Sequence, residues 1–262
     1  MPTFTDQLAR KIDLKKSPLR IISLVPSITE LLYDLGLKDE VIGITKFCVH
    51  PSSWKKEKTI IGGTKNFRVD QIKSLNPDLV IANKEENTEE GIKAIAAVCP
   101  TWISDVQDIT SAFEMIEGLA KVLSKEAKAQ NLVSKIKRGM NELIPKPTRR
   151  AVYLIWKDPY MAAGSDTFIS SMMTMAGYEN LIQTKRYPSL SIDELRTFNP
   201  EVVLLSSEPY PFKEKHLQAL ETELNCEIKL VDGELFSWYG SKMLKAVEVF
   251  KKDGEAPAAP PV

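Results

Sequence analysis

Cys48 and His50 are the residues best suited to chemistry, and both lie in the stretch FCVHP in the first half of the chain. A thiol and an imidazole at this spacing could ligate a metal ion directly, or supply one axial ligand to a cobalt or haem centre. The alternative is that Cys48 packs in the interior and His50 caps a turn before Pro51. A Cys-x-His pair is a short motif, so the sequence leaves both interpretations open.

A glycine-rich segment, IGGTKN, follows shortly afterwards. Its candidate ligand contacts are Gly63, Thr64, Lys65 and Asn66, which would offer backbone N–H groups and a cation. The alternative is a Gly-Gly turn that leads into the next helix. A P-loop requires G-x-x-x-x-G-K-[ST], and this segment lacks that spacing, so nucleotide hydrolysis is not indicated.

The elements that would position these loops include a stretch that occurs twice. Residues 69–85 are VDQIKSLNPDLVIANKE, and residues 192–208 are IDELRTFNPEVVLLSSE. Each copy contains an acidic helix start, a short amphipathic helix, an Asn-Pro break and a β-branched apolar run. Such a run is typical of a parallel strand buried on both faces, and ligand loops tend to follow the carboxyl ends of these strands.

The polar loops after the two repeated strands are therefore candidate ligand contacts. Glu85, Glu86 and Asn87 follow the first strand, and Glu208 follows the second. Carboxylates at these places could accept hydrogen bonds from amide-bearing or cationic ligands. Solvated loops without a ligand role are the alternative.

Aromatic residues occur in loops of the second half of the chain. Large apolar ligands such as corrins, porphyrins or aryl siderophores are held by aromatic platforms, whereas any single aromatic residue could instead pack in the interior. The candidates are Trp156 and Tyr160 in WKDPYMAAG, Trp238 and Tyr239 in SWYGS, and Arg186 and Tyr187 in KRYPSL. The second histidine, His216, is interpreted as a solvated helix residue without a site role.

Flanking segments repeat as well, which predicts an α/β fold of two Rossmann-like lobes with parallel-type sheets. RIISLV at residues 20–25 resembles RAVYLI at 150–155. Between them, helical spacing predicts two linking helices, the second a backbone helix of roughly 30 Å that joins lobes flanking a ligand cleft. The expected parts are an N-terminal arm (1–19), a first lobe (20–107), linking helices (108–147), a second lobe (148–251) and a disordered tail (252–262).

Composition bears on the compartment and on the partners. The 35 basic and 35 acidic residues give zero formal net charge, so neither nucleic-acid nor membrane-surface binding is indicated. Three scattered cysteines are interpreted as free thiols in a reducing compartment. A chain that naturally begins at Met1 would be cytoplasmic, whereas removal of a leader would imply a periplasmic or surface-anchored protein.

Together these segments resemble a known family, the class III (helical-backbone) substrate-binding proteins of ABC importers, which includes vitamin B12, ferric-siderophore and haem binders. The similarity spans roughly residues 20–251 and is carried by RIISLVPSITELLYDLG, VDQIKSLNPDLVIA, GSDTFISSMMTMAGYENLI and IDELRTFNPEVVLLS. FCVHP, GGTKN, NKEEN and SWYGSKM also resemble the branch labelled cobalamin-binding or helical-backbone metal receptor. Asn83 departs from the B12 binder, which has an aromatic residue at this place.

The resemblance implies a non-enzymatic, monomeric binder of cobalamin or a similar metal chelate, such as a ferric siderophore or haem, with no required cofactor. It also implies an ABC permease as a partner. Glu89 and Glu214, at the starts of outer helices, would dock onto permease arginines, unless they only complement the helix dipoles.

The residues leave a second class of function open. On the same scaffold, Cys48 and His50 could serve a cytosolic metal- or corrinoid-handling protein or an enzyme. Against catalysis, the sequence contains no Ser-His-Asp order, no HExxH motif and no dinucleotide fingerprint. The sequence therefore favours a binding protein over an enzyme.

Overall fold

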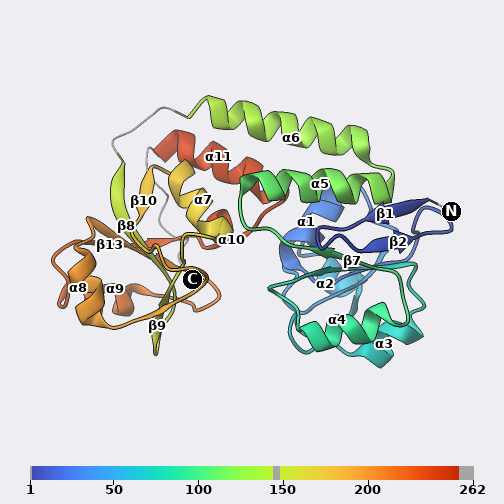
Figure 1. Ribbon diagram of the computed structural model, residues 1–262, viewed down its shortest axis with the longest axis horizontal. Coiled ribbons are helices and arrows are strands. Elements are labelled where there is room, and N and C mark those ends of the chain that lie inside the picture. The colour runs from blue at the N-terminus through green and yellow to red at the C-terminus, as the bar shows by residue number, and fades with distance from the viewer. Residues whose placement is uncertain (1, 144–147, 254–262) are drawn as a thin grey trace. The chain divides into compact units, whose positions relative to one another are not determined.

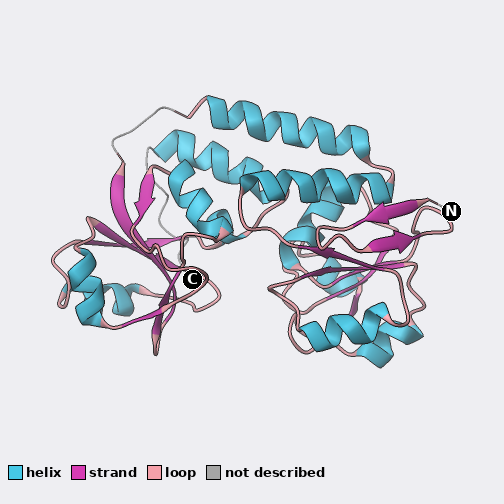
Figure 2. Ribbon diagram, viewed as in Figure 1, coloured by secondary structure: helices cyan, strands magenta, loops and turns pink. Residues whose placement is uncertain are grey.

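The computed structural model describes residues 2–143 and 148–253, which form two compact units. The first unit comprises residues 2–106, 110–134 and 239–242; the second comprises 107–109, 135–143, 148–238 and 243–253. Each unit is an α/β assembly with helices packed on a central sheet (Figure 1; Figure 2). The predicted fold class is confirmed.

The first unit is built on a five-stranded sheet of order β5-β4-β3-β6-β7 in which every pairing is parallel. Its strands are β3 (Ile21–Ser23), β4 (Val41–Ile44), β5 (Thr59–Ile60), β6 (Leu79–Asn83) and β7 (Thr101–Ser104). Its helices include α1 (Pro26–Asp34), α2 (Trp54–Glu57), α3 (Val69–Ser74), α4 (Glu89–Ala96) and most of α5 (Ile109–Leu123). Strands β3, β6 and β7 are buried along their whole length, because helices cover both faces of the sheet.

The expected N-terminal arm contains regular secondary structure. Strands β1 (Thr3–Thr5) and β2 (Lys11–Asp13) form an antiparallel pair. The buried Asp6 carboxylate accepts hydrogen bonds from the backbone N–H groups of Leu8, Arg10 and Ile103, the last of which belongs to β7. A buried carboxylate with three donors anchors the β1–β2 pair to the first unit. The polar composition of this segment gave no indication of the hydrogen bond to β7.

The second unit has a mixed sheet of order β11-β9-β8-β12-β13, with β10 also paired to β8. Strand β8 (Arg149–Trp156) runs parallel to β12 (Val202–Ser206) and β10 (Tyr178–Asn180), and β12 runs parallel to β13 (Glu227–Val231). Strands β9 (Tyr160–Ala162) and β11 (Ser189–Leu190) add antiparallel pairings where only loops were expected. The unit's helices are α7 (Phe168–Met175), α8 (Ile192–Phe198), α9 (Glu214–Glu221), α10 (Glu234–Ser237) and most of α11 (Lys242–Asp253).

The predicted sequence repeat corresponds to a repeated structural element. In the first copy α3 leads into β6, which pairs with β3; in the second, α8 leads into β12, which pairs with β8. Both breaks use a left-handed asparagine before proline, since Asn76 and Asn199 each have φ near 46°. Asparagine tolerates this conformation, and a residue before proline is disfavoured in the right-handed helical region. The Asn-Pro pairs therefore end both helices in the same way.

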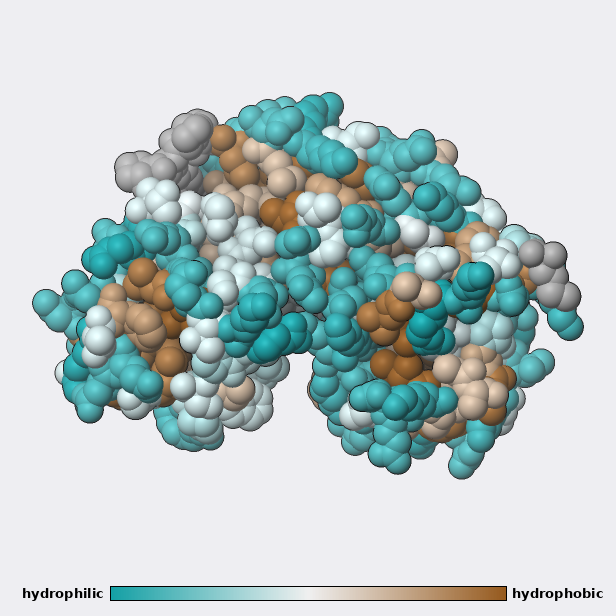
Figure 3. Space-filling view, in the orientation of Figure 1, coloured by the Kyte–Doolittle hydropathy of each residue, from teal (hydrophilic) through white to brown (hydrophobic). Residues whose placement is uncertain are grey.

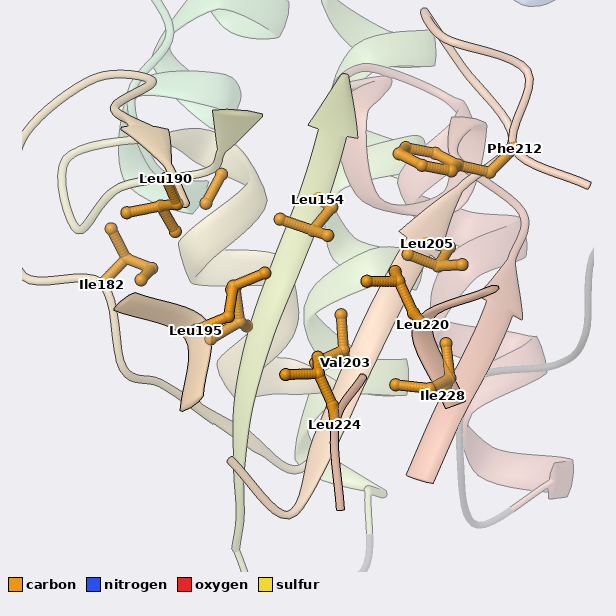
Figure 4. Close-up of a cluster of buried hydrophobic side chains, with 12 residues drawn as sticks. Leu154, Ile182, Leu190, Leu195, Val203, Leu205, Phe212, Leu220, Leu224 and Ile228 are labelled. Carbon is orange, nitrogen blue, oxygen red and sulfur yellow. The ribbon is translucent and has the colours of Figure 1, made fainter. Parts of the chain in front are cut away.

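A cluster of buried apolar side chains holds the sheet of the second unit to its helices (Figure 4). Leu154 of β8 and Leu205 of β12 lie in the cluster, together with Leu195 of α8 and Leu220 of α9. Phe212 also belongs to it, from the loop after β12. The cluster therefore fixes the ends of β8 and β12 and the loop that follows β12.

Two long helices lie near the middle of the chain, as predicted. Helix α5 is followed by α6 (Glu126–Asn141), whose 16 residues correspond to about 24 Å, less than the length predicted. The chain passes from the first unit to the second within α6. Only a narrow stripe of α6 is buried, and hydrophilic residues cover its outer side (Figure 3). Residues 144–147 of the expected linking helices and 254–262 of the expected tail lie outside the described residues, whereas Lys252 and Asp253, expected in the tail, are the last residues of α11.

Candidate ligand-binding site

The carboxyl edges of the two sheets gather most of the predicted site residues. In the first unit the loops after β4 and β6 contribute FCVHP and the segment 84–87. In the second unit the last residue of β8 is Trp156, and the loop after β12 contributes Glu208. In an open α/β sheet these edges are the usual place for a ligand. The structure then separates residues that can contact a ligand from residues that support the loops.

Cys48 is buried in the first unit. Its Sγ lies 3.1 Å from Thr29 Oγ1, which donates to it, and 3.2 Å from Thr45 Oγ1. Burial raises the pKa of the Cys48 thiol, and these hydroxyl contacts oppose the rise only in part. The geometry supports the packing interpretation for this residue.

His50 is only partly buried and is close enough to Glu30 to act on its charge. Within residues 2–143 and 148–253, no group of three or more histidine, cysteine, aspartate or glutamate side chains could hold a metal ion. Metal ligation by Cys48 and His50 thus remains a sequence-based prediction.

Phe47, next to Cys48, was missed by the sequence analysis. Its side chain is 50% exposed, which is unusual for a large apolar residue. A Cβ atom at Gly63 would approach the Phe47 ring to 3.2 Å and would clash with Asn66 Oδ1, so Gly63 permits close packing of the two loops. An aromatic residue inside a polar insertion was the signal that could have identified it.

Asn83 and Asn87 shape the loop after β6. The Asn83 side chain accepts from the N–H groups of Glu85 at 2.8 Å and Glu86 at 3.0 Å. Asn87 accepts from Asn83 N at 2.8 Å and donates to the Thr64 carbonyl at 2.8 Å. Both amides are buried, so Asn87 supports the loop, while the carboxylates of Glu85 and Glu86 remain partly exposed.

Lys65 and Asn66 are exposed on the glycine-rich turn. The Lys65 ammonium group donates to the carbonyl of Glu85, which joins this turn to the loop after β6. Lys65 therefore brings a positive charge beside the two carboxylates of that loop.

Tyr239 belongs to the first unit, although it comes from the second half of the chain. Its hydroxyl donates to Glu86 Oε1 at 3.4 Å, and its ring is buried. Burial raises the pKa of Tyr239 well above its ordinary value, with the Glu86 charge adding to the rise. Three residues later, Lys242 Nζ pairs with Glu30 Oε1 at 3.1 Å. Tyr239 therefore packs in the first unit. The sequence analysis had instead grouped it with the loop aromatics of the second half of the chain.

Trp238 and Glu208 contact each other in the second unit. The Glu208 carboxylate accepts from Trp238 Nε1 at 2.6 Å and from Ser237 Oγ at 2.8 Å. Burial raises the pKa of Glu208, and these two hydrogen bonds oppose the rise. Trp238 is buried as well, so this predicted pair anchors α10 and exposes little aromatic surface.

Trp156 supplies the exposed aromatic surface of the second unit. Its side chain is 41% exposed, and its ring lies 5.6 Å from that of Tyr210. Tyr160 is partly buried on the neighbouring strand, and Lys157 Nζ lies 5.9 Å from the Tyr160 ring. The sequence analysis included Trp156 and Tyr160, and Tyr210 lies two residues after the predicted Glu208.

Arg186 and Tyr187 lie in the loop before β11, where Arg186 is exposed and its guanidinium lies 5.9 Å from the Tyr187 ring. Strand β11 pairs with β9, the strand that begins at Tyr160. This pairing brings the loop to the same part of the sheet as the Trp156 surface.

The two predicted docking glutamates are the first residues of their helices. Glu89 begins α4 and pairs with Lys93 at 2.6 Å, and Glu214 begins α9. Both are exposed. Their positions are compatible both with permease docking and with the helix-dipole alternative.

Among the described residues, no helix combines the length and the apolar character that crossing a membrane requires.

Comparison with known proteins identifies the family. A family model described as "Periplasmic binding protein" matches residues 21–223. The substrate-binding lipoprotein YvrC of Bacillus subtilis, described as an uncharacterized ABC transporter component, is 26% identical over 265 residues, covering 94% of this chain and 83% of YvrC. The vitamin B12-binding protein of Yersinia pestis (strain Pestoides F) is 26% identical over 194 residues, covering 71% of this chain and 69% of the relative.

Solved structures share the fold. The periplasmic haem-binding protein RhuT of Roseiflexus sp. RS-1 superposes with a TM-score of 0.75 at 21% identity, covering 88% of this chain and 95% of RhuT. The vitamin B12-binding protein BtuF of Vibrio cholerae gives a TM-score of 0.73 at 19% identity, covering 89% of this chain and 95% of BtuF. The resemblance deduced from the sequence is confirmed. The chain belongs to the periplasmic binding protein family, as a non-catalytic substrate-binding protein of the ABC-importer type.

Proposed function

We propose that this protein binds cobalamin or a similar metal chelate, such as haem or a ferric siderophore, at the carboxyl edges of its two sheets and presents it to an ABC permease. The observation that carries the proposal is the position of the exposed aromatic residues. Phe47 follows β4 and Trp156 ends β8, so each unit exposes one large aromatic side chain at its carboxyl edge. Exposed aromatic rings at a ligand edge suit a ligand with a broad apolar face.

Polar groups beside these rings provide the complementary contacts. Glu85 and Glu86 in the first unit offer acceptors, whereas Lys65 and Arg186 offer positive charge. Corrins and porphyrins present both a flat ring system and peripheral amides or carboxylates. The relatives named for vitamin B12 and haem support this ligand class without choosing between its members.

The alternative of a cytosolic metal- or corrinoid-handling protein or enzyme receives less support from the site. A nucleophilic or metal-binding thiol needs access and a stabilised thiolate, but Cys48 is buried and its pKa is raised. The proposal therefore assigns His50 and the loop surfaces, rather than the Cys48 thiol, to ligand contact.

The test is titration with cyanocobalamin, hemin and a ferric hydroxamate chelate, followed by tryptophan emission and calorimetry. We expect saturable binding of one of them in the micromolar range or tighter. Trp156→Ala and Phe47→Ala should each weaken that binding by about 1–2 kcal/mol, roughly 5- to 30-fold, because each removes an aromatic contact.

Leu19→Ala is the matched control, since Leu19 is 57% exposed but precedes β3, at the opposite edge of the sheet. Absence of saturable binding to all three ligands would contradict the proposal. Equal losses in Leu19→Ala and in the two aromatic variants would contradict the proposed position of the site.

For delivery, we propose that Glu89 and Glu214 contact the permease. Charge reversal, as Glu89→Lys with Glu214→Lys, is compared with the wild type at saturating ligand, so that a change in ligand affinity does not enter the comparison. It should lower the ligand-dependent ATPase activity of the reconstituted transporter. Unchanged ATPase stimulation would favour the helix-dipole alternative.

A further inference from the structure

We propose that His216 is a positioning residue for the ligand surface of the second unit. Through Tyr210, it presents a phenolic hydrogen-bond donor beside the exposed Trp156 ring. This edge would then select ligands that combine a flat apolar face with a hydrogen-bond acceptor, such as an amide carbonyl or a carboxylate. The inference rests on the proposed function and adds a residue that the sequence analysis had set aside.

A chain of rings connects the surface to the interior. Trp156 and Tyr210 meet nearly edge to face, with centroids 5.6 Å apart and an interplanar angle of 68°. Tyr210 lies 4.8 Å from Phe212, which is buried in the apolar cluster of this unit (Figure 4). Phe212 in turn contacts His216 at 5.7 Å, with ring planes at 90°. Tyr210 is therefore held between a buried ring and an exposed one.

The backbone fixes which nitrogen of His216 carries the proton. The N–H of Lys213, which precedes α9, donates to His216 Nδ1 at 3.0 Å. A nitrogen that accepts a hydrogen bond carries no proton in the neutral ring, so the proton is on Nε2. His216 thus has one acceptor and one donor, and both have defined directions.

The donor of His216 points to Tyr210. Nε2 lies 3.3 Å from the Tyr210 hydroxyl, so the phenolic oxygen accepts this hydrogen bond. A hydroxyl that accepts from one side keeps its own proton to donate elsewhere. The arrangement therefore makes Tyr210 a donor toward a further group.

The position of Tyr210 makes a ligand the natural acceptor. The Tyr210 N–H donates to the Ile155 carbonyl at 3.4 Å, which holds the residue at the end of β8, directly before Trp156. Tyr210 is partly exposed, in contrast to Tyr153, which lies within β8 and is fully buried.

The surrounding charges keep His216 neutral. Partial burial lowers the pKa of His216, and Lys215, Lys157 and Lys213 lower it further, while Asp158 opposes them. Protonation would place a hydrogen on Nδ1, facing the Lys213 N–H, so the ring could no longer be held by that bond. We therefore expect the positioning of Tyr210 to be lost in acid, below the ordinary histidine range near pH 6.5.

A ligand-free measurement tests the geometry first. The chain has 2 histidines, so the ¹⁵N spectrum of histidine-labelled protein contains one reference, His50, besides His216. We expect the His216 ring to be neutral at pH 7.5 with its proton on Nε2. A proton on Nδ1, or a charged ring at this pH, would overturn the inference whether or not a ligand is bound.

Binding then tests the role, with whichever of cyanocobalamin and hemin binds the wild-type protein. Tyr210→Phe should weaken binding about 5- to 10-fold, and His216→Leu should do the same, because both remove the oriented donor. The double variant should be no weaker than Tyr210→Phe alone. His216→Gln, which retains an acceptor and a donor, should recover most of the affinity, and Gln218→Leu on the exposed part of α9 is the matched control.

The pH profile separates positioning from packing. Wild-type affinity should fall as the pH drops below the ordinary histidine range near 6.5, whereas the affinity of Tyr210→Phe should be lower but flat across this range. Additive losses in the double variant, or His216→Leu with wild-type affinity, would overturn the inference while leaving the proposed function intact. Binding of the ferric hydroxamate chelate alone would overturn the inference, because that ligand has no flat apolar face, and wild-type protein that binds none of the three ligands would overturn the proposed function itself.

Discussion

The ion pair between Lys242 and Glu30 offers a sharp test of how the first unit is held together. Lys242 begins α11, and its side chain is 3% exposed; the Glu30 side chain, on α1, is 21% exposed. Within the described residues, Glu30 Oε2 has no hydrogen-bond partner. Lys242 is thus the main compensation for burying this carboxylate, and the substitution Lys242→Met removes it at similar volume.

The expected loss of stability depends on how deeply the Glu30 carboxylate is buried once Lys242 is removed. Removing one partner of a fully buried pair costs about 3–5 kcal/mol, because the other charge stays in a poorly solvated place. The Glu30 side chain is 21% exposed, so water compensates part of the charge that remains. We therefore expect Lys242→Met to lower the free energy of unfolding by about 2–3 kcal/mol at pH 8. The double variant with Glu30→Gln should recover at least half of this loss.

The pH dependence has a definite sign. Burial raises the pKa of Glu30 above its ordinary value of 4.5, while Lys242 opposes the rise. A raised pKa means that the protonated carboxyl is favoured in the folded state, so stability is lost as the pH rises through the folded pKa. Lys242→Met should raise this pKa further. Its deficit should consequently be largest at pH 8 and should shrink toward pH 5, where Glu30 can take up a proton.

The assay is urea unfolding at pH 8 and pH 5, combined with hydrogen exchange of peptides that cover α1 and β6 in the first unit. The exposed pair Lys93 and Glu89 provides the control, since Lys93→Met should change stability far less than Lys242→Met at either pH. A deficit of Lys242→Met that is equal at both pH values would refute the argument. So would a double variant less stable than the single one.

Three further predictions concern the same loops and cores. In the folded protein, iodoacetamide should modify the partly exposed Cys226 before the buried Cys48, as measured by mass spectrometry; equal modification in native buffer would be inconsistent with the burial of Cys48. Leu205→Ala should destabilise the second unit by about 2–4 kcal/mol in urea, through a cavity in the apolar cluster, and a loss below about 1 kcal/mol would count against that packing. Asn83→Ala should speed hydrogen exchange in residues 84–87, whereas Asn66→Ala, on the exposed turn, should not; matching exchange rates in the two variants would argue against the proposed loop scaffold.

Local patterns in the sequence were sufficient for the repeated elements. The strands β6 and β12 are short, continuous apolar runs, and their helices end at Asn76-Pro77 and Asn199-Pro200. These signals act within a few residues, because helix ends and strand burial depend on backbone preference and on apolar content. These short-range signals also made the family recognisable from the sequence. They did not reveal β9, β11 or the N-terminal pair, which are short and gain their order from neighbours distant in the chain.

The candidate site was only partly accessible to sequence reasoning. Loops that follow buried strands could be located, so Trp156 and Glu85 were found. Which side chains in those loops face outward could not be predicted. Trp238 and Tyr239 are adjacent in the sequence. Trp238 nevertheless donates a hydrogen bond to Glu208 in the second unit, and Tyr239 donates one to Glu86 in the first.

The sequence by itself determined the duplicated α/β pattern, the boundaries marked by Asn-Pro, and membership of the binding-protein family. The tertiary structure alone decided that Cys48 is buried, that Phe47 is exposed, and that His216 meets Tyr210. The physical reason is that exposure and hydrogen-bond partners depend on segments brought together by folding. The Lys213 amide, the Phe212 ring and the Ile155 carbonyl must all be in place before His216 can orient a hydroxyl.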